Sequence, residues 1–500
     1  MKHTAVRYTH GDLPLFVAKS KMLKGAQVRP FDPRIVVRGQ AHIKVAWCQP
    51  PMNSGLAEDL VVKPPNRPSL TGLALLSPLR HFWPATVDTH IHSPPWHHMF
   101  NDITLDLAGM KRILFELTPD LVCLTAMPYN HEALLELATL AKGWDATVIV
   151  GGHHATFAAE LIMRSQGAID AVCVHQGQEA LVEIVGGLKF SEIPNLVWRD
   201  RNGEVHVNEI VHTPMSTILP DFPYIDYRLA YDDHHVATTD TVAPTHLQQG
   251  CHFRTFVPKF CEFCACSEPY TDSLTPEQAV RLLYQLRMRF GIKQVNDVSE
   301  DLTGNKPWFN AFCAEHRKRH SSEMPAFWQI SSRGNISSRT ADMLAGLGVH
   351  SIFIGAESGA DEILKNMCKH ITAKIYQRTF GILMERGIRP AIGIVAGCTG
   401  ESSATLAQTR SFVEQFVEQF QRAFGELPYV EFSPLSPRMG APVREKLMQD
   451  PSFRAKHSER AFPDGSAEAR DATPILTNGL SFDYLCDWIR RTREDLGLNH

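Results

Sequence analysis

The feature of this chain that most restricts its fold is the alternation of short β-type runs with helical patterns. Such runs occupy residues 42–48, 86–92, 120–127, 146–152 and 168–177, and a helical pattern follows each of them. This rhythm predicts a doubly wound parallel sheet of the α/β class, which binds ligands at the carboxyl ends of its strands. A hairpin that turns at Asn202-Gly203 then closes this part of the chain.

The same alternation starts again at residues 246–250. Further strands are expected at residues 292–298, 326–331, 350–355, 389–397 and 429–435. Six strands of this kind predict an open, partial (β/α)6 barrel rather than a closed barrel of eight strands. The best-marked helix has Thr275 as its cap, Pro276 at its first position, Gln278 to complete a capping box and Gly291 at its end.

The length of the chain predicts more than one domain. It has 500 residues, whereas single hydrophobic cores stop growing at about 250–300 residues. We predict an N-terminal extension (1–40), a Rossmann-like domain (41–208), a linker (209–244), a barrel (245–440) and a C-terminal extension that closes the cleft (441–500).

The composition is that of an ordinary soluble protein. With 44% hydrophobic residues, 21% charged residues and a net charge of −4, the chain has no global attraction to nucleic acid or anionic membranes. Its first residues lack the apolar core of a signal peptide, and no apolar run approaches the roughly 18–20 residues that span a bilayer. We therefore expect a cytoplasmic protein with neither a nucleic-acid nor a membrane partner.

Four of the eleven cysteines, Cys251, Cys261, Cys264 and Cys266, fall within sixteen residues. In a chain of this length such a group indicates a metal site rather than a disulfide framework. Three thiolates can hold a 4Fe–4S cluster and leave one iron open for a ligand. A zinc site would use four ligands, the fourth from Cys266 or His252. The spacing alone leaves both kinds of site open.

Several motifs occur in a fixed order around these cysteines. They are Gly250-Cys251, the Cys-Glu-Phe-Cys of 261–264, the Ser-Glu-Asp-Leu-Thr of 299–303, Arg333, the Gly-Ala-Glu-Ser-Gly of 355–359 and the Gly-Cys-Thr-Gly-Glu-Ser of 397–402. With these motifs the chain resembles, from about residue 42 to 442, the radical S-adenosylmethionine (SAM) enzymes that carry an N-terminal cobalamin-binding domain. The resemblance implies a Rossmann-like cobalamin domain followed by a partial radical SAM barrel.

The resemblance also implies roles for individual residues of the barrel. Cys251, Cys261 and Cys264 would bind a 4Fe–4S cluster, whose open iron holds the amino and carboxylate groups of SAM. The side chains implied to bind SAM are those of Phe263, Glu300, Arg333, Glu357 and Ser358. Nine residues separate Cys251 from Cys261, where the family has three, so 254–259 resembles an insertion. Cys266 is the alternative third ligand.

The N-terminal domain carries loops that match those around cobalamin in the same family. The residues implied to bind cobalamin are Leu70, Gly72, Thr125, Ala126, Gly151, Gly152, His154, Gly177, Gln178 and Glu179. Glycines at strand ends let the backbone approach a large flat macrocycle. The Asp-x-His-x-x-Gly motif of many cobalamin proteins is absent after the first strand, as it is in many relatives.

The function implied by the resemblance is that of a cobalamin-dependent C- or P-methyltransferase. A 5′-deoxyadenosyl radical and methylcobalamin would act on a small biosynthetic intermediate of natural-product metabolism, and an electron donor such as flavodoxin or ferredoxin would reduce the cluster. Alternatives are a radical SAM rearrangement, cyclisation or other SAM-derived group transfer, and a noncatalytic metal- or cobalamin-binding regulator. Glu300, Asp301, Tyr270 and Cys398 are candidates for lining the substrate pocket.

Overall fold

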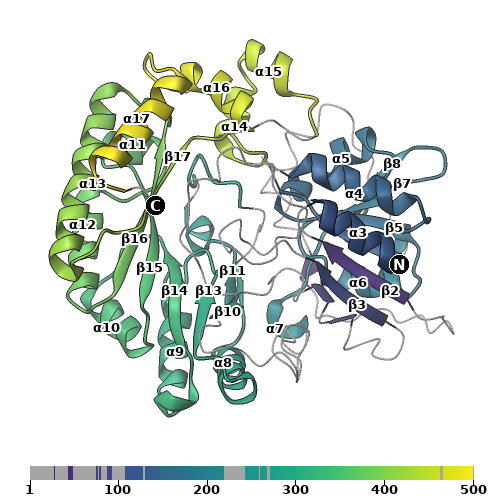
Figure 1. The fold of residues 1–500 in the computed structure, drawn as a ribbon, viewed down its shortest axis with the longest axis horizontal. Coiled ribbons are helices and arrows are strands. Elements are labelled where there is room, and N and C mark those ends of the chain that lie inside the picture. The colour runs from purple at the N-terminus through teal and green to yellow at the C-terminus, as the bar shows by residue number, and fades with distance from the viewer. Residues whose placement is uncertain are drawn as a thin grey trace.

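The computed structural model describes residues 27–28, 43–48, 75–76, 78–79, 87–92, 107–127, 130–218, 242–257, 259–266, 271–461 and 465–498. In Figure 1, the two sheets with their helices lie beside each other. The C-terminal helices from α14 (Pro442–Leu447) to α16 (Gly465–Leu476) lie at one end of the barrel. In the part of the chain that the structure describes, no helix has the length and apolar character needed to cross a membrane.

The N-terminal domain is built on a seven-stranded sheet. In spatial order its strands are β3 (Val87–His92), β2 (Ile43–Cys48), β4 (Leu121–Thr125), β5 (Thr147–Gly151), β6 (Ala171–Cys173), β7 (Leu196–Arg199) and β8 (Val205–Val207). The pairs from β3 to β6 are parallel, and β6–β7 and β7–β8 are antiparallel. Because the chain runs outward in both directions from β2, the predicted doubly wound sheet is confirmed.

Alternate residues of these strands face two separate cores. The helices are α3 (Leu107–Leu117), α4 (His131–Lys142), α5 (His153–Ser165) and α6 (Gln178–Val185). In β4, Val122 and Leu124 pack with α3, α4 and α5, whereas Leu121 and Cys123 pack with α6 on the opposite face. Both faces of the sheet are therefore covered, and its ligand-binding edge is the one at the carboxyl ends of the strands.

The predicted hairpin is present between β7 and β8. The carboxylate of Asp200 accepts hydrogen bonds from the N–H groups of Asn202 and Glu204 (2.9 Å each). Gly203 has a φ of 83°, which a glycine adopts without strain. The short helix η2 (Phe190–Glu192) precedes the hairpin.

The second domain is an open barrel of six parallel strands. In spatial order they are β10 (Val242–Thr245), β13 (Gln294–Asp297), β14 (Ala326–Ser332), β15 (Ser351–Glu357), β16 (Arg389–Ala396) and β17 (Val430–Pro434). All five pairings are parallel, so the predicted partial (β/α)6 barrel is confirmed.

The position expected for the first barrel strand, 246–250, is wrong. The strand is β10, which lies within the expected linker, and Gln248–Gln249 instead form β11, antiparallel to β12 (Asp272–Ser273). The buried carboxylate of Asp297 explains the change, because it accepts hydrogen bonds from the Thr245 hydroxyl and the Leu247 N–H (3.0 Å each). These bonds turn the chain out of the sheet.

The rest of the expected linker is also partly regular. It contains β9 (Val211–His212), which pairs with β1 (Gln27–Val28), and the short helix α7 (Met215–Ile218).

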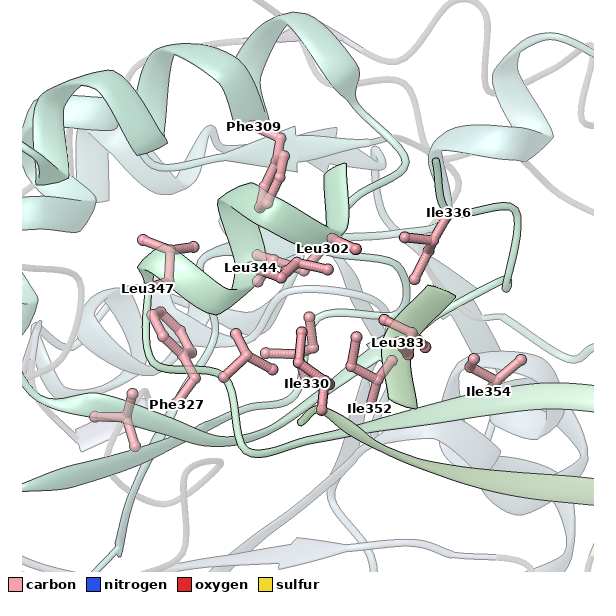
Figure 2. Close-up of a cluster of buried hydrophobic side chains, with 14 of the residues drawn as sticks. Leu302, Phe309, Phe327, Ile330, Ile336, Leu344, Leu347, Ile352, Ile354 and Leu383 are labelled. Atoms are coloured by element: carbon pink, nitrogen blue, oxygen red, sulfur yellow. The ribbon is translucent and has the colours of Figure 1, made fainter. Parts of the chain in front are cut away.

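Helices cover the outside of the barrel. They are α8 (Pro276–Phe290), α9 (Lys306–His316), α10 (Ser338–Gly346), α11 (Asp361–Asn366), α12 (Ala373–Met384) and α13 (Ser403–Phe424), with the short η5 (Ser321–Glu323) between α9 and β14. Figure 2 shows the core beneath them, in which Ile330 and Ile352 of neighbouring strands pack near Leu344 of α10. The capping box of α8 is confirmed, because Thr275 and Gln278 exchange hydrogen bonds between side chain and main-chain N–H (3.2 and 3.0 Å).

The chain beyond residue 440, expected as a C-terminal extension, is helical. It forms α14 (Pro442–Leu447), α15 (Pro451–His457), α16 (Gly465–Leu476) and α17 (Phe482–Asp495). The apolar periodicity of these helices is not evident in the sequence, because some of the charged residues are buried as ion pairs. The guanidinium of Arg444 contacts the Glu468 carboxylate at 2.6 Å, and the two side chains are 5% and 1% exposed.

The two domains touch through the carboxyl edge of the N-terminal sheet. Phe157 of α5 packs beside Ala441 and Ala265 of the barrel side. The amide of Gln176 donates to that of Gln249 (3.2 Å), and His154 Nε2 lies 2.7 Å from the carbonyl oxygen of Ala461. The carboxyl ends of both sets of strands thus face a common region.

Candidate active site

The clustered cysteines lie on a loop at the carboxyl ends of the barrel strands, where such barrels carry their chemistry. Cys251 follows β11 after Gly250 and caps the short helix η4 (His252–Thr255). Cys261 and Cys264 share a tight turn, in which the N–H of Cys264 donates to the carbonyl of Cys261 (3.1 Å). Cys261 is buried, and Cys251 and Cys264 are partly exposed.

The donor set fits a cluster better than a single ion. Around one tetrahedral zinc, two thiolate sulfurs lie about 3.8 Å apart, since each Zn–S bond is about 2.3 Å. Among the described residues, the only three ligand atoms of His, Cys, Asp or Glu that all lie within 4.8 Å of one another belong to Asp200, Glu204 and His206. The three thiols therefore do not have the close spacing of ligands to a single zinc ion, and their binding of a 4Fe–4S cluster stays a prediction.

Both candidates for the third ligand lie close to other groups of the cysteine loop. Burial, and then the nearby thiol of Cys266, raise the pKa of Cys264 to about 12. Burial also raises the pKa of Cys251, but there the Arg333 guanidinium opposes it. Arg333 also donates a hydrogen bond to Cys261, so its positive charge acts on both of these thiols. The choice of Cys251 stays a prediction.

Arg333 lies at the end of β14 and points at the cysteine loop. Its Nη1 is 3.2 Å from the Sγ of Cys261, and its Nη2 donates to the carbonyl of Lys369 (2.6 Å). The ring of Phe253 lies 3.7 Å from the centre of the guanidinium. The structure thus places this predicted SAM-binding residue directly on a predicted cluster ligand.

Glu357, the next predicted SAM-binding residue, is held in a buried ion pair. It ends β15 at a bulge, with a φ of 67°, and its Oε1 lies 2.8 Å from Nζ of Lys369. Burial disfavours the ammonium, but the Glu357 carboxylate outweighs it and raises the pKa of Lys369. The hydroxyl of Tyr376 donates to the carbonyl of Gly355 (3.0 Å) beside this pair. The pair orients Glu357 toward the cysteine loop, because Nζ of Lys369 also lies over the ring of Phe263 (5.6 Å).

The remaining predicted SAM-binding residues differ in their surroundings. Glu300 contacts His246 at 3.9 Å, and its side chain is 37% exposed. Burial alone would raise the pKa of Glu300, but His246 and the main chain at Gly250 lower it overall, which keeps the carboxylate charged. Ser358 is buried and shares a hydrogen bond with the hydroxyl of Thr409 on α13 (3.0 Å), so it supports the turn rather than facing the site.

The other pocket candidates are buried side chains. Asp301 accepts a hydrogen bond from the Thr303 hydroxyl (3.1 Å), and Cys398 is fully buried, which raises the pKa of its thiol. Tyr270 lies outside the described residues.

Glu262 ties the cysteine turn to two other segments. Its carboxylate accepts hydrogen bonds from the N–H and the hydroxyl of Thr399 (3.2 and 3.0 Å) in the loop after β16. Its N–H donates to the carbonyl of Met367, and its carbonyl accepts from the N–H of Val443 in α14 (3.0 and 2.8 Å). The position of the cluster ligands therefore depends on the C-terminal helices.

The predicted cobalamin residues lie at one edge of the N-terminal sheet. Thr125 ends β4 and is followed by Ala126, Gly151 ends β5 and is followed by Gly152, and Gly177 caps the start of α6. These small residues leave an edge of mostly main chain, which fits a flat macrocycle. Gly152 has a further reason to be glycine, since its φ is 99° and a Cβ would lie 2.9 Å from the Thr125 side chain.

The polar residues of that edge are engaged by the protein itself. Burial lowers the pKa of His154 to about 4, and its Nε2 contacts the Ala461 carbonyl. Glu179 accepts a hydrogen bond from the Thr213 hydroxyl (2.9 Å), and Gln178 is buried. His154 is therefore a neutral contact to the C-terminal segment rather than a free ligand. Leu70 and Gly72 lie outside the described residues.

His153 connects the two predicted cofactor sites. Burial and the nearby Arg438 lower the pKa of His153 overall. A hydrogen bond with the main chain of Ala265 and the charge of Glu300 oppose that shift. A small hollow opens beside it between α5 and the C-terminal segment. The residues that line this hollow are His153, His154, Ser436, Arg438, Met439, Gly465 and Glu468.

Sequence reasoning missed Lys369, Arg438 and Glu262 as members of the site. Lys369 lies between Cys368 and His370, which both have positive φ (55° and 54°). No local sequence pattern predicted this backbone conformation. Glu262 was visible only as the variable position of the cysteine turn.

Comparisons with known proteins identify both domains. Residues 245–413 match the model of the radical SAM superfamily, and residues 102–185 match that of the B12 binding domain. This chain is a radical SAM enzyme with a B12-binding domain. A radical SAM domain implies a 4Fe–4S cluster and SAM, and a B12-binding domain implies cobalamin.

Two curated proteins are similar to this radical SAM enzyme. It is 23% identical over 348 residues to the uncharacterized methyltransferase PH0819 of Pyrococcus horikoshii, which covers 68% of this chain and 72% of that protein. It is 24% identical over 334 residues to the anaerobic magnesium-protoporphyrin IX monomethyl ester cyclase of Rubrivivax gelatinosus, with coverage of 62% and 56%.

Two solved structures share the fold of the enzyme. The radical SAM methyltransferase TsrM from Kitasatospora setae, with cobalamin and a 4Fe–4S cluster bound, has a TM-score of 0.59 at 15% identity and covers 81% of this chain and 78% of that chain. The cobalamin-dependent SAM radical enzyme OxsB, with aqua-cobalamin and SAM bound, has a TM-score of 0.61 at 15% identity, with coverage of 91% and 72%.

These findings confirm the predicted family, fold class, enzymatic nature and cofactors of the protein. Because the chain is an enzyme, the alternative of a noncatalytic metal- or cobalamin-binding regulator is excluded. The domain boundaries and the roles of single residues stay predictions.

Proposed function

We propose that this enzyme is a cobalamin-dependent methyltransferase that acts on a carbon or phosphorus atom of a small biosynthetic intermediate. The observation that carries the proposal is the position of His153, which belongs to the B12-binding domain yet lies against Ala265 and near Glu300 of the barrel. Groups held at the two strand edges would therefore face one shared space. The similarity to a methyltransferase over 68% of the chain supports the same reaction.

The side chains of this chain would divide the work between holding and shielding. Cys251, Cys261 and Cys264 would hold the cluster, and the loops after β4, β5 and β6 would hold cobalamin. Bound there, the cluster with SAM supplies a carbon-centred radical, and cobalamin supplies a transferable methyl group. Phe263 and the charged Glu300 would orient SAM beside the cluster loop.

The contacts between the domains would keep water out of the shared space. The apolar cluster of Phe157, Ala265 and Ala441 closes one side of it. Exclusion of water and oxygen matters because a carbon radical reacts with either the substrate or whatever else reaches it. A one-electron donor such as flavodoxin or ferredoxin would reduce the cluster.

The test is product analysis with SAM that carries a trideuterated methyl group. The anaerobically purified enzyme, with its cluster and cobalamin, is incubated with reductant and with candidate substrates from neighbouring biosynthetic steps. Methyl transfer predicts a product that gains the mass of a CD3 group, and a Cys261→Ala control predicts none. Turnover of a substrate without deuterium gain would contradict the proposal.

The similarity to a cyclase supports a second candidate, a radical SAM cyclisation, rearrangement or other SAM-derived group transfer. This reaction also needs the cluster and SAM, but it does not place the methyl group of SAM in the product. Formation of 5′-deoxyadenosine together with an unlabelled, rearranged product would favour it.

A further inference from the structure

The side chain of Arg333 is fixed on every side by the cysteine loop and its surroundings. One edge of the guanidinium reaches Cys261 Sγ (3.2 Å), and another donates to the carbonyl of Lys369 (2.6 Å). The ring of Phe253 covers one face at 3.7 Å. Gly334, with a φ of 93°, lets the chain turn directly afterwards, since a Cβ there would lie 2.7 Å from Ile354.

The buried Asp301 carboxylate lies near Arg333 and accepts a hydrogen bond from its main chain, but it makes no direct contact with the guanidinium. Within the described ranges, no Asp or Glu oxygen forms an ion pair with its guanidinium, whereas Lys369 next to it is paired with Glu357. The hydrogen-bond acceptors of Arg333 are a sulfur and a carbonyl. Its charge is therefore directed at the thiol group that is predicted to bind iron.

A cation and a hydrogen bond at a ligand sulfur change the reduction potential of an iron–sulfur cluster. The reduced cluster carries one more negative charge than the oxidised one. A donor at the ligand sulfur stabilises that charge and raises the potential, so that a one-electron donor such as a reduced flavodoxin or ferredoxin can deliver the electron.

We propose that Arg333 is a positioning residue that sets the reduction potential of the cluster through Cys261, instead of a residue that binds SAM. The inference rests on Cys261 as a cluster ligand, and it holds whether or not the enzyme transfers a methyl group.

The long gap between Cys251 and Cys261 has a role in this arrangement. Phe253 belongs to that gap and packs between Arg333 and the ring of His370 (5.5 Å). A guanidinium covered by an aromatic ring is less hydrated, which strengthens its interactions with nearby charges. The extended loop thus supplies a cover for Arg333.

The experiment measures the midpoint potential of the cluster in the full-length, anaerobically reconstituted protein without substrate. Reductant is titrated in, and the reduced cluster is quantified by electron paramagnetic resonance. Iron content and SAM affinity are measured on the same samples. We expect Arg333→Gln to lower the equilibrium constant for reduction of the cluster about tenfold, which is a shift of about 59 mV to lower potential for one electron. Its SAM affinity should stay within a factor of two of the wild type.

Two further variants keep the proposal testable if Arg333→Gln binds no cluster. Arg333→Lys retains the positive charge, so the midpoint potential of its cluster should lie closer to that of the wild type than the potential of Arg333→Gln does. Phe253→Leu retains the guanidinium but exposes it to water, and should lower the potential by less than Arg333→Gln.

Arg254 in the same loop offers a matched control. Its guanidinium also lies over an aromatic ring, that of Phe260 at 4.1 Å, and its charge lies near Cys264, but its hydrogen bond goes to the carbonyl of Cys266. Arg254→Gln should shift the potential much less than Arg333→Gln. Equal shifts in the two variants, or an unchanged potential with SAM affinity lost in Arg333→Gln, would overturn the proposal. If Arg333→Gln binds no cluster, an unchanged potential in Phe253→Leu would overturn it.

Discussion

At the scale of single residues, the site depends on polar groups that are buried with a specific partner. Removing one member of a buried ion pair such as Glu357–Lys369 leaves an uncompensated charge, which typically costs about 3–5 kcal/mol. His154 is a different case, because the protein buries it in its neutral form against the Ala461 carbonyl.

The buried His154 predicts a loss of stability at mildly acidic pH. Burial lowers its pKa in the folded protein to about 4, from about 6.5 in the unfolded chain. The unfolded chain therefore binds more protons between these values, so stability falls as the pH drops below 6.5. By pH 5 the loss from this residue is about 2 kcal/mol.

Unfolding midpoints between pH 7 and pH 5 test this prediction. The side chain of His154→Gln can still donate to the Ala461 carbonyl but does not titrate. Between pH 7 and pH 5 its free energy of unfolding should therefore fall by about 2 kcal/mol less than that of the wild type. Identical declines in the two proteins would show that His154 does not contribute.

At the scale of elements, the cysteine turn is held by its neighbours rather than by its own conformation. Glu262 joins it to the loop after β16 and to α14. The nearby amine of Lys446 adds a contact to the Thr399 hydroxyl (3.2 Å).

Weakening this attachment should make the cluster less secure. Residues that orient metal ligands typically change metal affinity by about 10–100-fold when replaced. In Glu262→Gln one acceptor oxygen becomes a donor that faces the donors of Thr399, so we expect a chelator to remove iron about tenfold faster. The rate is followed by the loss of the visible absorbance of the cluster.

The matched control is Glu414→Gln, which breaks a surface ion pair with Arg410 on α13. It should lose iron at the wild-type rate. If Glu262→Gln also did so, the anchoring role of Glu262 would be wrong.

At the scale of the whole molecule, the proposed reaction would require the two domains to meet closely. Gly440, just before α14, touches the ring of Phe157 on α5 of the B12-binding domain. Its φ is 85°, and a Cβ would lie 2.4 Å from that ring. The close approach of the domains thus depends on the absence of one methyl group.

Gly440→Ala should separate the domains without emptying either cofactor site. We expect methyl transfer to fall at least about tenfold, because misplacement of reacting groups by about 1 Å can cost about 10²-fold in rate. Iron and cobalamin contents, measured on the same protein, should stay near the wild-type values.

Gly425→Ala is the control for backbone strain alone. Gly425 has a similar φ of 73°, and nothing lies within 4 Å of a Cβ at this position. It should retain activity, and Phe157→Ala should restore part of the activity of Gly440→Ala. Full activity in Gly440→Ala would contradict the need for this contact.

The sequence alone was sufficient to predict the two series of strands and their order. Continuous apolar runs such as that of β4 predict strands buried on both faces, and Thr275, Gln278 and Gly291 mark the ends of α8 locally. The motifs of the cysteine turn and of residues 355–359 predicted the family. These signals are local, since each depends on neighbours within a few positions of the chain.

Tertiary structure alone decided the features that join distant segments. The end of β10 depends on Asp297, about fifty residues later, and the helices after residue 440 depend on buried pairs such as Arg444–Glu468. The partner of Glu357 is Lys369, and Arg333 turns to Cys261, 72 positions away. Sequence spacing carries no record of such contacts, because they form only when packing brings the carboxyl ends of different strands together.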